Sequence, residues 1–97
     1  MFYPFLHVER VRPLGGHRLA VAFTDGTERE VDLSGELHGE VFEPLRDEAL
    51  FAQAYVDPDT RTVAWPTGAD FAPEFLHEIG RETGREGAAE RERVGAA

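Results

Sequence analysis

The stretch RLAVAFTDGTEREVDL, residues 18–33, decides the fold because it reads as two strands joined by a tight turn. Apolar side chains alternate with small or charged ones, which is typical of strands with one buried face. A three-residue turn at 24–26 pairs Leu19 with Val31 and keeps the apolar side chains on one face, whereas a two-residue turn would place acidic side chains among them. The sequence therefore predicts a type I turn with a left-handed Gly26 in a β-bulge.

Weaker patterns lie on both sides of this hairpin. Residues 7–12 predict a strand that ends at Pro13. Val8 and Val11 have opposite parity within it, which indicates a bulge or a curved strand. Residues 34–43 contain two glycines and no clean period, so we expect a loop with a short helical turn.

Residues 54–57 and 61–65 predict a second hairpin around a turn at Pro58. Asp47 can cap a short helix that ends at Phe51. The residues that we expect this second hairpin to place in the core are Tyr55, Val63 and Trp65.

A second helix begins at Pro73, whose fixed φ suits a first helical turn. Phe71, Phe75 and Ile79 recur every four residues. With Leu76 beside them, they predict an apolar face that packs on the sheet, and the next glycine is well placed as the C-cap. Together the elements predict an α+β fold, with an antiparallel sheet of about five strands in hairpins and one or two short helices on one face.

The chain has 97 residues, 10 basic against 19 acidic side chains, and a formal net charge of −9. This length predicts a single domain, which we place at residues 1–80. Residues 81–97 hold equal numbers of acidic and basic side chains, and Val94 is their only large apolar residue. We expect this segment to be a flexible polar tail, because it cannot bury enough surface to offset its ordering entropy.

The composition argues against several functional classes. No apolar run reaches the roughly 18 residues of a membrane helix, and the N-terminus lacks the basic start of a signal peptide, so we expect a cytoplasmic protein. Without cysteine there are no disulfides or thiol nucleophiles. The acidic balance disfavours direct binding to nucleic acid. The aromatic residues Phe2, Tyr3 and Phe5 lie outside any periodic element, and we expect them to pack back on the sheet.

The sequence also lacks a recognisable catalytic or metal-binding constellation. The histidines do not have the i, i+4 spacing of a helical metal site. The one serine, Ser34, lies outside a Gly-x-Ser-x-Gly motif, and there is no lysine. We therefore expect no catalytic residue, no metal and no cofactor. The four histidines are His7, His17, His38 and His77.

Three acidic residues, Glu28, Glu30 and Asp32, alternate on the solvent face of one predicted strand. Such a stripe can simply be solvated, and it can guard a sheet against edge-to-edge pairing. It can also be a docking surface for a basic partner, which is the functional interpretation that we test.

Four segments resemble a known family when they are taken in order. They are LAVAFTDG at 19–26, VDL at 31–33, FEPLRD at 42–47 and VAWPTGAD at 63–70. The resemblance is to the bacterial family called domain of unknown function 2442, and it covers about residues 6–78. It implies a small α+β domain, often encoded beside another small protein in an arrangement similar to a toxin–antitoxin pair. No activity or catalytic residue follows from it.

Two departures from the family's pattern affect this expectation. The family often has Ser or Thr where Ala72 lies, so the following helix lacks its usual cap unless Asp70 substitutes. No helix-turn-helix segment follows, so we expect no DNA-binding domain in this chain. Trp65, Pro66, Gly68 and Asp70 form a candidate functional loop, although each also has a structural role, which we favour.

These observations favour a small acidic protein-interaction module that binds a small basic protein, in the manner of an antitoxin or an accessory subunit. The alternative is a small-ligand binder or an enzyme with a carboxylate and histidine site at His77. The sequence leaves self-association open.

Overall fold

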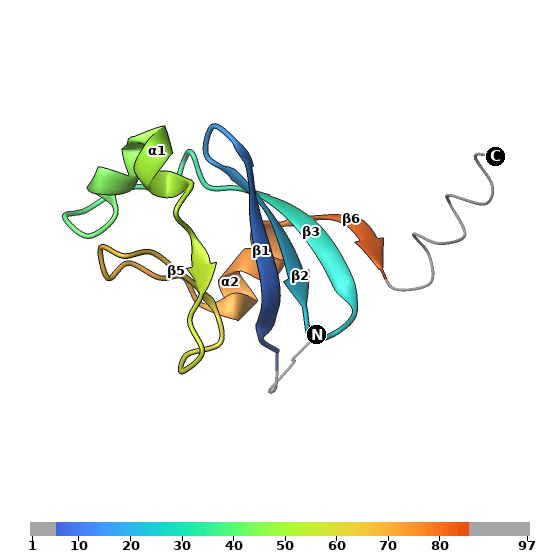
Figure 1. The fold of residues 1–97 in the computed structure, drawn as a ribbon. Coiled ribbons are helices and arrows are strands. Elements are labelled where there is room, and N and C mark those ends of the chain that lie inside the picture. The colour runs from blue at the N-terminus through green and yellow to red at the C-terminus, as the bar shows by residue number, and fades with distance from the viewer. Residues whose placement is uncertain (1–5, 86–97) are drawn as a thin grey trace.

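The computed structural model of the protein describes residues 6–85, and a four-stranded antiparallel sheet forms its body (Figure 1). The sheet has the order β1-β2-β3-β6, and β4 and β5 form a separate two-stranded sheet. The predicted α+β fold is confirmed, with six strands among the described residues. None of the helices in this part of the chain is long and apolar enough to cross a membrane. The elements are β1 (Val8–Gly15), β2 (Arg18–Phe23), β3 (Thr27–Asp32), the 3₁₀ helix η1 (Glu43–Arg46), α1 (Glu48–Phe51), β4 (Tyr55–Val56), β5 (Val63–Ala64), α2 (Pro73–Ile79) and β6 (Arg81–Arg85).

The hairpin of β2 and β3 has the predicted register. Leu19 pairs with Val31, so the apolar side chains of both strands lie on one face. The backbone N–H of Gly26 donates to the carbonyl of Phe23 at 3.1 Å, and Gly26 has a φ of 88°. The predicted three-residue turn with a left-handed glycine is therefore confirmed.

Strand β1 contains the bulge that the parity of its valines indicated. Its pairing with β2 shifts register between Val8 and Arg10. This shift lets Val8 lie fully in the core while Val11 packs partly against it. The predicted irregularity is thus the means by which one edge strand places both valines inward.

The second hairpin pairs β4 with β5, but one of its predicted core residues is wrong. Tyr55 pairs with Ala64 and is 42% exposed, whereas Val56 pairs with the buried Val63 and packs against the core. Neighbouring residues of a strand point to opposite faces, so Val56 takes the inward position that we had given to Tyr55.

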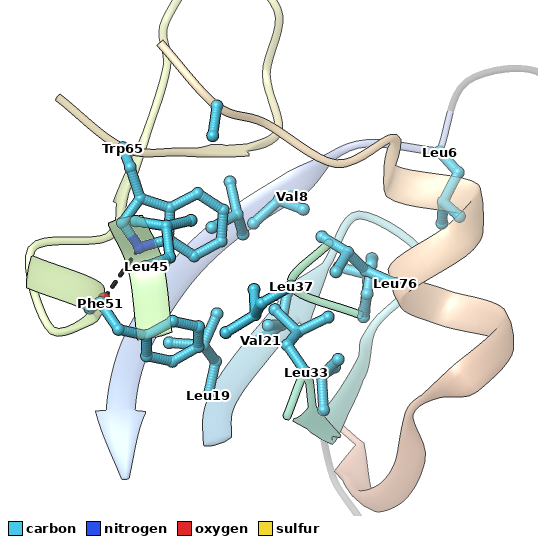
Figure 2. Packing of buried hydrophobic residues seen from close by; sticks show 14 residues of the cluster. Leu6, Val8, Leu19, Val21, Leu33, Leu37, Leu45, Phe51, Trp65 and Leu76 are labelled. Carbon is cyan, nitrogen blue, oxygen red and sulfur yellow. Dashed lines mark hydrogen bonds between the residues drawn. The ribbon is translucent and has the colours of Figure 1, made fainter. Parts of the chain in front are cut away.

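The core fills the space between the inner face of the sheet and the chain segments that cover it (Figure 2). Figure 1 shows α2 behind the sheet and α1 at the end farthest from β6. Trp65 is buried in the core, and its indole Nε1 donates to the carbonyl of Phe51 at 2.8 Å. Asp47 caps α1 as predicted, because its carboxylate accepts from the backbone of Ala49 at 2.9 Å.

Helix α2 ends against β3 at Gly80, which is its C-cap as predicted. The reason for a glycine differs from the usual one, since Gly80 has a φ of −74° and not a left-handed conformation. A Cβ at this position would lie 2.8 Å from the carbonyl oxygen of Leu76 and 2.9 Å from the Cβ of Arg29. Close approach of the helix end to the sheet therefore selects glycine here.

The predicted boundary of the flexible tail is wrong for its first residues. Arg81–Arg85 form β6, which pairs antiparallel with β3. Backbone pairing and polar contacts hold this strand, so its lack of apolar residues did not prevent order: the Arg81 guanidinium lies 3.1 Å from Glu30, and Thr83 donates to the carbonyl of Glu28 at 3.2 Å. The rest of the predicted tail, residues 86–97, and the aromatic cluster at residues 2–5 lie outside the described residues.

Candidate functional site

The predicted acidic stripe lies on the outer face of β3, but its central charge is already neutralised. Glu30 lies between two arginines, 2.8 Å from Arg18 and 3.1 Å from Arg81. The two arginines come from β2 and β6, the strands on either side of β3. The stripe therefore offers a basic partner less net charge than three free carboxylates would.

Asp32, at the end of the stripe, is committed to a local turn. Its carboxylate accepts from the backbone N–H of Ser34 at 2.9 Å. Hydrogen bonds from the backbone and the side chain of Ser34 are the main reason that the pKa of Asp32 lies below its ordinary value of 3.8, with help from the charge of Arg18. A carboxylate in this state stays charged through the neutral range while serving the turn.

The loop from Trp65 to Asp70 repeats the turn of the first hairpin. Gly68 has a φ of 94°, and its N–H donates to the carbonyl of Trp65 at 2.9 Å. Pro66 is exposed at the turn, while Trp65 is 1% exposed in the core. Asp70 is exposed and makes no cap, because no side chain hydrogen-bonds the start of α2; the suggested capping role of Asp70 is wrong.

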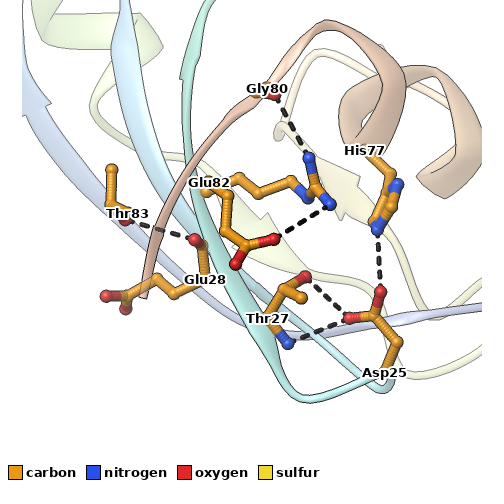
Figure 3. A network of polar contacts seen from close by, with 8 residues as sticks. Asp25, Thr27, Glu28, His77, Gly80, Glu82 and Thr83 are labelled. Atoms are coloured by element: carbon orange, nitrogen blue, oxygen red, sulfur yellow. Dashed lines mark hydrogen bonds and ion pairs between the residues drawn. The ribbon is translucent and has the colours of Figure 1, made fainter. Parts of the chain in front are cut away.

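His77 on α2 binds Asp25 in the turn between β2 and β3 (Figure 3). The ring Nε2 lies 2.8 Å from an oxygen of Asp25, and the two side chains are 13% and 16% exposed. The His77 ring also meets Phe23 edge-on, with centroids 5.0 Å apart. Sequence analysis had assigned Asp25 to the turn alone, because the 52 positions between the two residues hid their contact.

Hydrogen bonding outweighs burial at Asp25. Partial burial raises the pKa of its carboxyl, but hydrogen bonds from the hydroxyl and backbone N–H of Thr27 and from His77 bring the pKa below 3.8. The Thr27 bonds measure 2.7 and 3.0 Å. A carboxylate with this many partners is a structural link between α2 and the hairpin.

Two other histidines bind backbone carbonyls. His17 contacts the carbonyl of Arg46 at 2.9 Å, and His38 contacts that of Gly35 at 2.8 Å. Within residues 6–85, no three histidines or carboxylates are grouped so that they could hold a metal ion. His17 thus connects the start of β2 to the 3₁₀ helix η1, and His38 stabilises its own loop.

A row of apolar side chains remains partly uncovered along α2, the residues just before it and the loop before η1, and we call it the aromatic rim. Phe42 stacks on Phe71 with ring centroids 4.6 Å apart, and Phe71 stacks on Phe75 at 5.5 Å. At its two ends, Val41 is 52% exposed and Ile79 is 37% exposed. The aromatic rim consists of Val41, Phe42, Phe71, Phe75 and Ile79.

The aromatic rim corrects the predicted core face of α2. Leu76 alone is fully buried on this helix, whereas Phe75 is half-buried and Ile79 is exposed. Leu76 lies about 100° around the helix from Phe75. The helix therefore turns Leu76 toward the sheet, and the predicted apolar stripe of Phe71, Phe75 and Ile79 lies at the border with solvent. The predicted stripe exists, but it lies at the edge of the core.

Acidic side chains flank the aromatic rim. Glu40 and Glu43 adjoin Val41 and Phe42 in the chain, and both are exposed. On α2, the exposed Glu74 and Glu78 lie on the opposite side of Phe75 from Leu76, as the helical period requires. The result is an apolar strip with carboxylates along it.

The part of the aromatic rim that comes from the loop could not be predicted from sequence periodicity. Val41 and Phe42 lie in a segment without a clear period, for which we expect a loop with a short helical turn. The available signal was the segment Glu-Val-Phe-Glu at 40–43, in which two large apolar residues stand between acids without a strand or helix to bury them.

Comparisons with known proteins bear on the family alone. Neither the curated proteins nor the solved structures contain a match. Residues 8–82 match a family described as "Protein of unknown function (DUF2442)", in agreement with the resemblance seen in the sequence. The match spans β1 to β5 and the first two residues of β6, and so the chain belongs to the DUF2442 family.

Proposed function

We propose that this domain is a protein-interaction module that binds a basic, amphipathic segment of a small partner protein through the aromatic rim. The observation that carries the proposal is the partly uncovered stack of Phe42, Phe71 and Phe75. Uncovered apolar side chains gathered in one place on a small domain are typical of a binding surface.

The energetics favour these residues as anchors. Aromatic side chains dominate protein interfaces because they bury a large area and lose little side-chain entropy. The rings of the aromatic rim already stack on one another, so a partner would meet an ordered surface. The carboxylates beside them suit a partner with lysine or arginine around its apolar side chains, and the net charge of −9 would speed its approach.

The acidic stripe of Glu28, Glu30 and Asp32 is the second surface that such a partner could use. The ion pairs of Glu30 with Arg18 and Arg81 weaken this candidate relative to the aromatic rim. Replacing both Glu28 and Glu30 by arginine tests whether the partner binds at the acidic stripe or at the aromatic rim. The proposal expects this pair of substitutions to leave binding at the aromatic rim within about threefold of wild type.

The arrangement implied by the family resemblance suggests which partner to test first. We propose that it is the small protein encoded beside this one, with the domain acting as its antitoxin-like or accessory subunit in the bacterial cytoplasm. A carboxylate and histidine site gains no comparable support, because Asp25 and His77 are engaged with each other and with Thr27 and Phe23.

Affinity capture with three baits tests this proposal. The baits are the wild-type chain, a rim variant with Val41→Lys and Ile79→Lys, and a control variant with Gln53→Lys and Thr60→Lys. All four positions are exposed, so each variant gains the same charge without disturbing the core. Each bait is incubated with lysate from cells that also express the neighbouring small protein, at low and at moderate salt.

The proposal expects that small protein in stoichiometric amount on the wild-type and control baits, and its loss from the rim variant. Moderate salt should reduce capture, because it screens exposed charges beyond about 10 Å. Equal capture by all three baits, or capture of background proteins alone, would contradict the proposal.

A further inference from the structure

The outer face of the four-stranded sheet contains a hollow of about 500 Å³. Its floor is formed by Ala20 and Ala22 of β2, and the segment from Ala54 to Val56 closes one side. This face lies opposite the one that carries Leu19, Val21 and Phe23 into the core. The hollow is therefore distinct from His77 and from the aromatic rim, and it reaches the core only at its edge, through Val11 and Val56.

The hollow follows from the order of side chains across the sheet. Ala22 pairs with Arg10 on β1 and with Glu28 on β3, while Ala20 pairs with Arg12 on β1. Neighbouring strands lie about 4.8 Å apart, so the short alanines form a trough between long side chains on either side. Tyr55, the residue that the structure turned away from the core, stands at its border with its side chain exposed.

The arginines of the four-stranded sheet differ in their ionic partners. Three other arginines, Arg18, Arg29 and Arg81, each lie within 4 Å of a carboxylate from another strand. Arg12 has no carboxylate within that distance among residues 6–85, and Arg10 reaches only its neighbour Glu9 at 4.0 Å. Arg12 is thus the arginine of the hollow without a carboxylate, and Arg10, which lines the same hollow from β1, has only the distant carboxylate of its neighbour, in a protein with a large excess of acids.

We propose that this hollow binds a small organic anion with an apolar ring. Arg10 and Arg12 hold its carboxylate or phosphate group, because guanidinium donors match both groups in geometry and charge. The ring lies on Ala20 and Ala22 beside Tyr55. The volume is in the range of ordinary small-molecule sites, which enclose about 300–1,000 Å³.

Glu28 on the opposite wall determines the orientation of the ligand in the hollow. Its carboxylate repels an anion, so the anionic group of the ligand is confined to the side of Arg10 and Arg12. Replacing Glu28 by glutamine removes this repulsion at nearly constant size. The proposal therefore expects Glu28→Gln to bind a simple anion more tightly, the opposite of the effect of losing an arginine.

Methyl NMR of alanine-labelled protein tests the site with defined probes. Phenyl phosphate and phenylacetate represent the two anionic groups, and benzyl alcohol is the neutral probe of similar size. Ala20 and Ala22 report on the floor, and the exposed Ala49 and Ala52 report on non-specific effects. The chains compared are the wild type, Arg12→Gln, Glu28→Gln, and Arg61→Gln, whose exposed arginine does not line the hollow.

At least one anion should shift the methyl signals of Ala20 and Ala22 saturably, and benzyl alcohol should bind at least tenfold more weakly, as expected for the loss of charge-assisted hydrogen bonds at about tenfold each. Arg12→Gln should weaken anion binding about tenfold, Glu28→Gln should strengthen it severalfold, and Arg61→Gln should leave it unchanged. The inference is overturned if neither anion shifts the floor signals, or if Arg12→Gln binds as wild type does. The rim variant should bind these probes normally, so this test is independent of the proposed partner.

Discussion

The Asp25 carboxylate joins two parts of the chain that lie 52 positions apart. It receives hydrogen bonds from Thr27 at the start of β3 and from His77 on α2. A single acidic residue thus stabilises the hairpin turn and holds α2 against the hairpin (Figure 3). The energetic consequence depends on pH, because only the ionised carboxylate can accept all of these bonds.

The lowered pKa of Asp25 sets the direction of that dependence. Its stabilising contribution is complete above the ordinary pKa of 3.8 and is lost as the pH falls through the lower pKa of the folded state. We expect Asp25→Asn to lower the free energy of unfolding by about 1–2 kcal/mol at neutral pH and by much less well below pH 3.8. Urea unfolding followed by the fluorescence of Trp65 measures this difference.

Asp59→Asn is the matched control for that prediction, since Asp59 is exposed in the turn after β4. Its cost should stay within about 0.5 kcal/mol at both pH values. If Asp25→Asn lowered the free energy of unfolding equally at neutral and acidic pH, the contribution of Asp25 would not depend on its ionisation, which would contradict the prediction.

Gly80 carries a prediction about the contact between α2 and β3. We expect Gly80→Ala to cost about 1–3 kcal/mol, because the added methyl group would meet backbone and side-chain atoms below 3.0 Å and the helix end must move away from the sheet. Gly35→Ala is the control, since nothing lies within 4 Å of its added Cβ. Similar melting temperatures for the two variants would contradict this close approach.

At the scale of elements, the same turn occurs twice. The hairpin of β2 and β3 ends in Thr24-Asp25-Gly26, and the loop after β5 contains Pro66-Thr67-Gly68. Each glycine donates its N–H to the residue three positions earlier and has a φ near 90°. In each case the left-handed glycine lets a short turn return the chain in the correct register.

We expect Gly26→Val and Gly68→Val each to cost about 1–3 kcal/mol, because a β-branched residue is strained at a left-handed φ. Gly35→Val is the control, since Gly35 has no positive φ. Chemical denaturation measures the free energy of unfolding of the three variants. A loss of stability for Gly35→Val as large as for the other two would contradict the turn assignment.

The elements also show why some of the fold could be predicted from the sequence and some could not. The register of β2 and β3 follows from local turn chemistry and alternation, so it was predictable. The tilt of α2, which buries Leu76 and leaves Phe75 at the border, depends on how far Gly80 can approach β3. Strand β6 depends on Glu30 as a distant partner, and no pattern within the strand itself indicates that contact.

At the scale of the whole molecule, the small core explains why apolar residues remain at the surface. The sheet buries the side chains that face α2, and the helix has only seven residues with which to cover it. The segment before η1 contributes Phe42 to complete the cover, and the stacked rings then form the border of the core. The aromatic rim is a candidate site that only the packed molecule reveals, because its residues come from two separate parts of the chain.

The most direct test of the central claim is the affinity of the captured partner for three purified chains, measured by titration calorimetry. The chains are the wild type, the rim variant with Val41→Lys and Ile79→Lys, and the control with Gln53→Lys and Thr60→Lys. We expect the rim variant to bind about 100-fold more weakly, because each lysine replaces an apolar contact at one end of the rim at about tenfold each, and the control to stay within about threefold of wild type. Equal affinities for the wild type and the rim variant would show that the aromatic rim is not the binding surface.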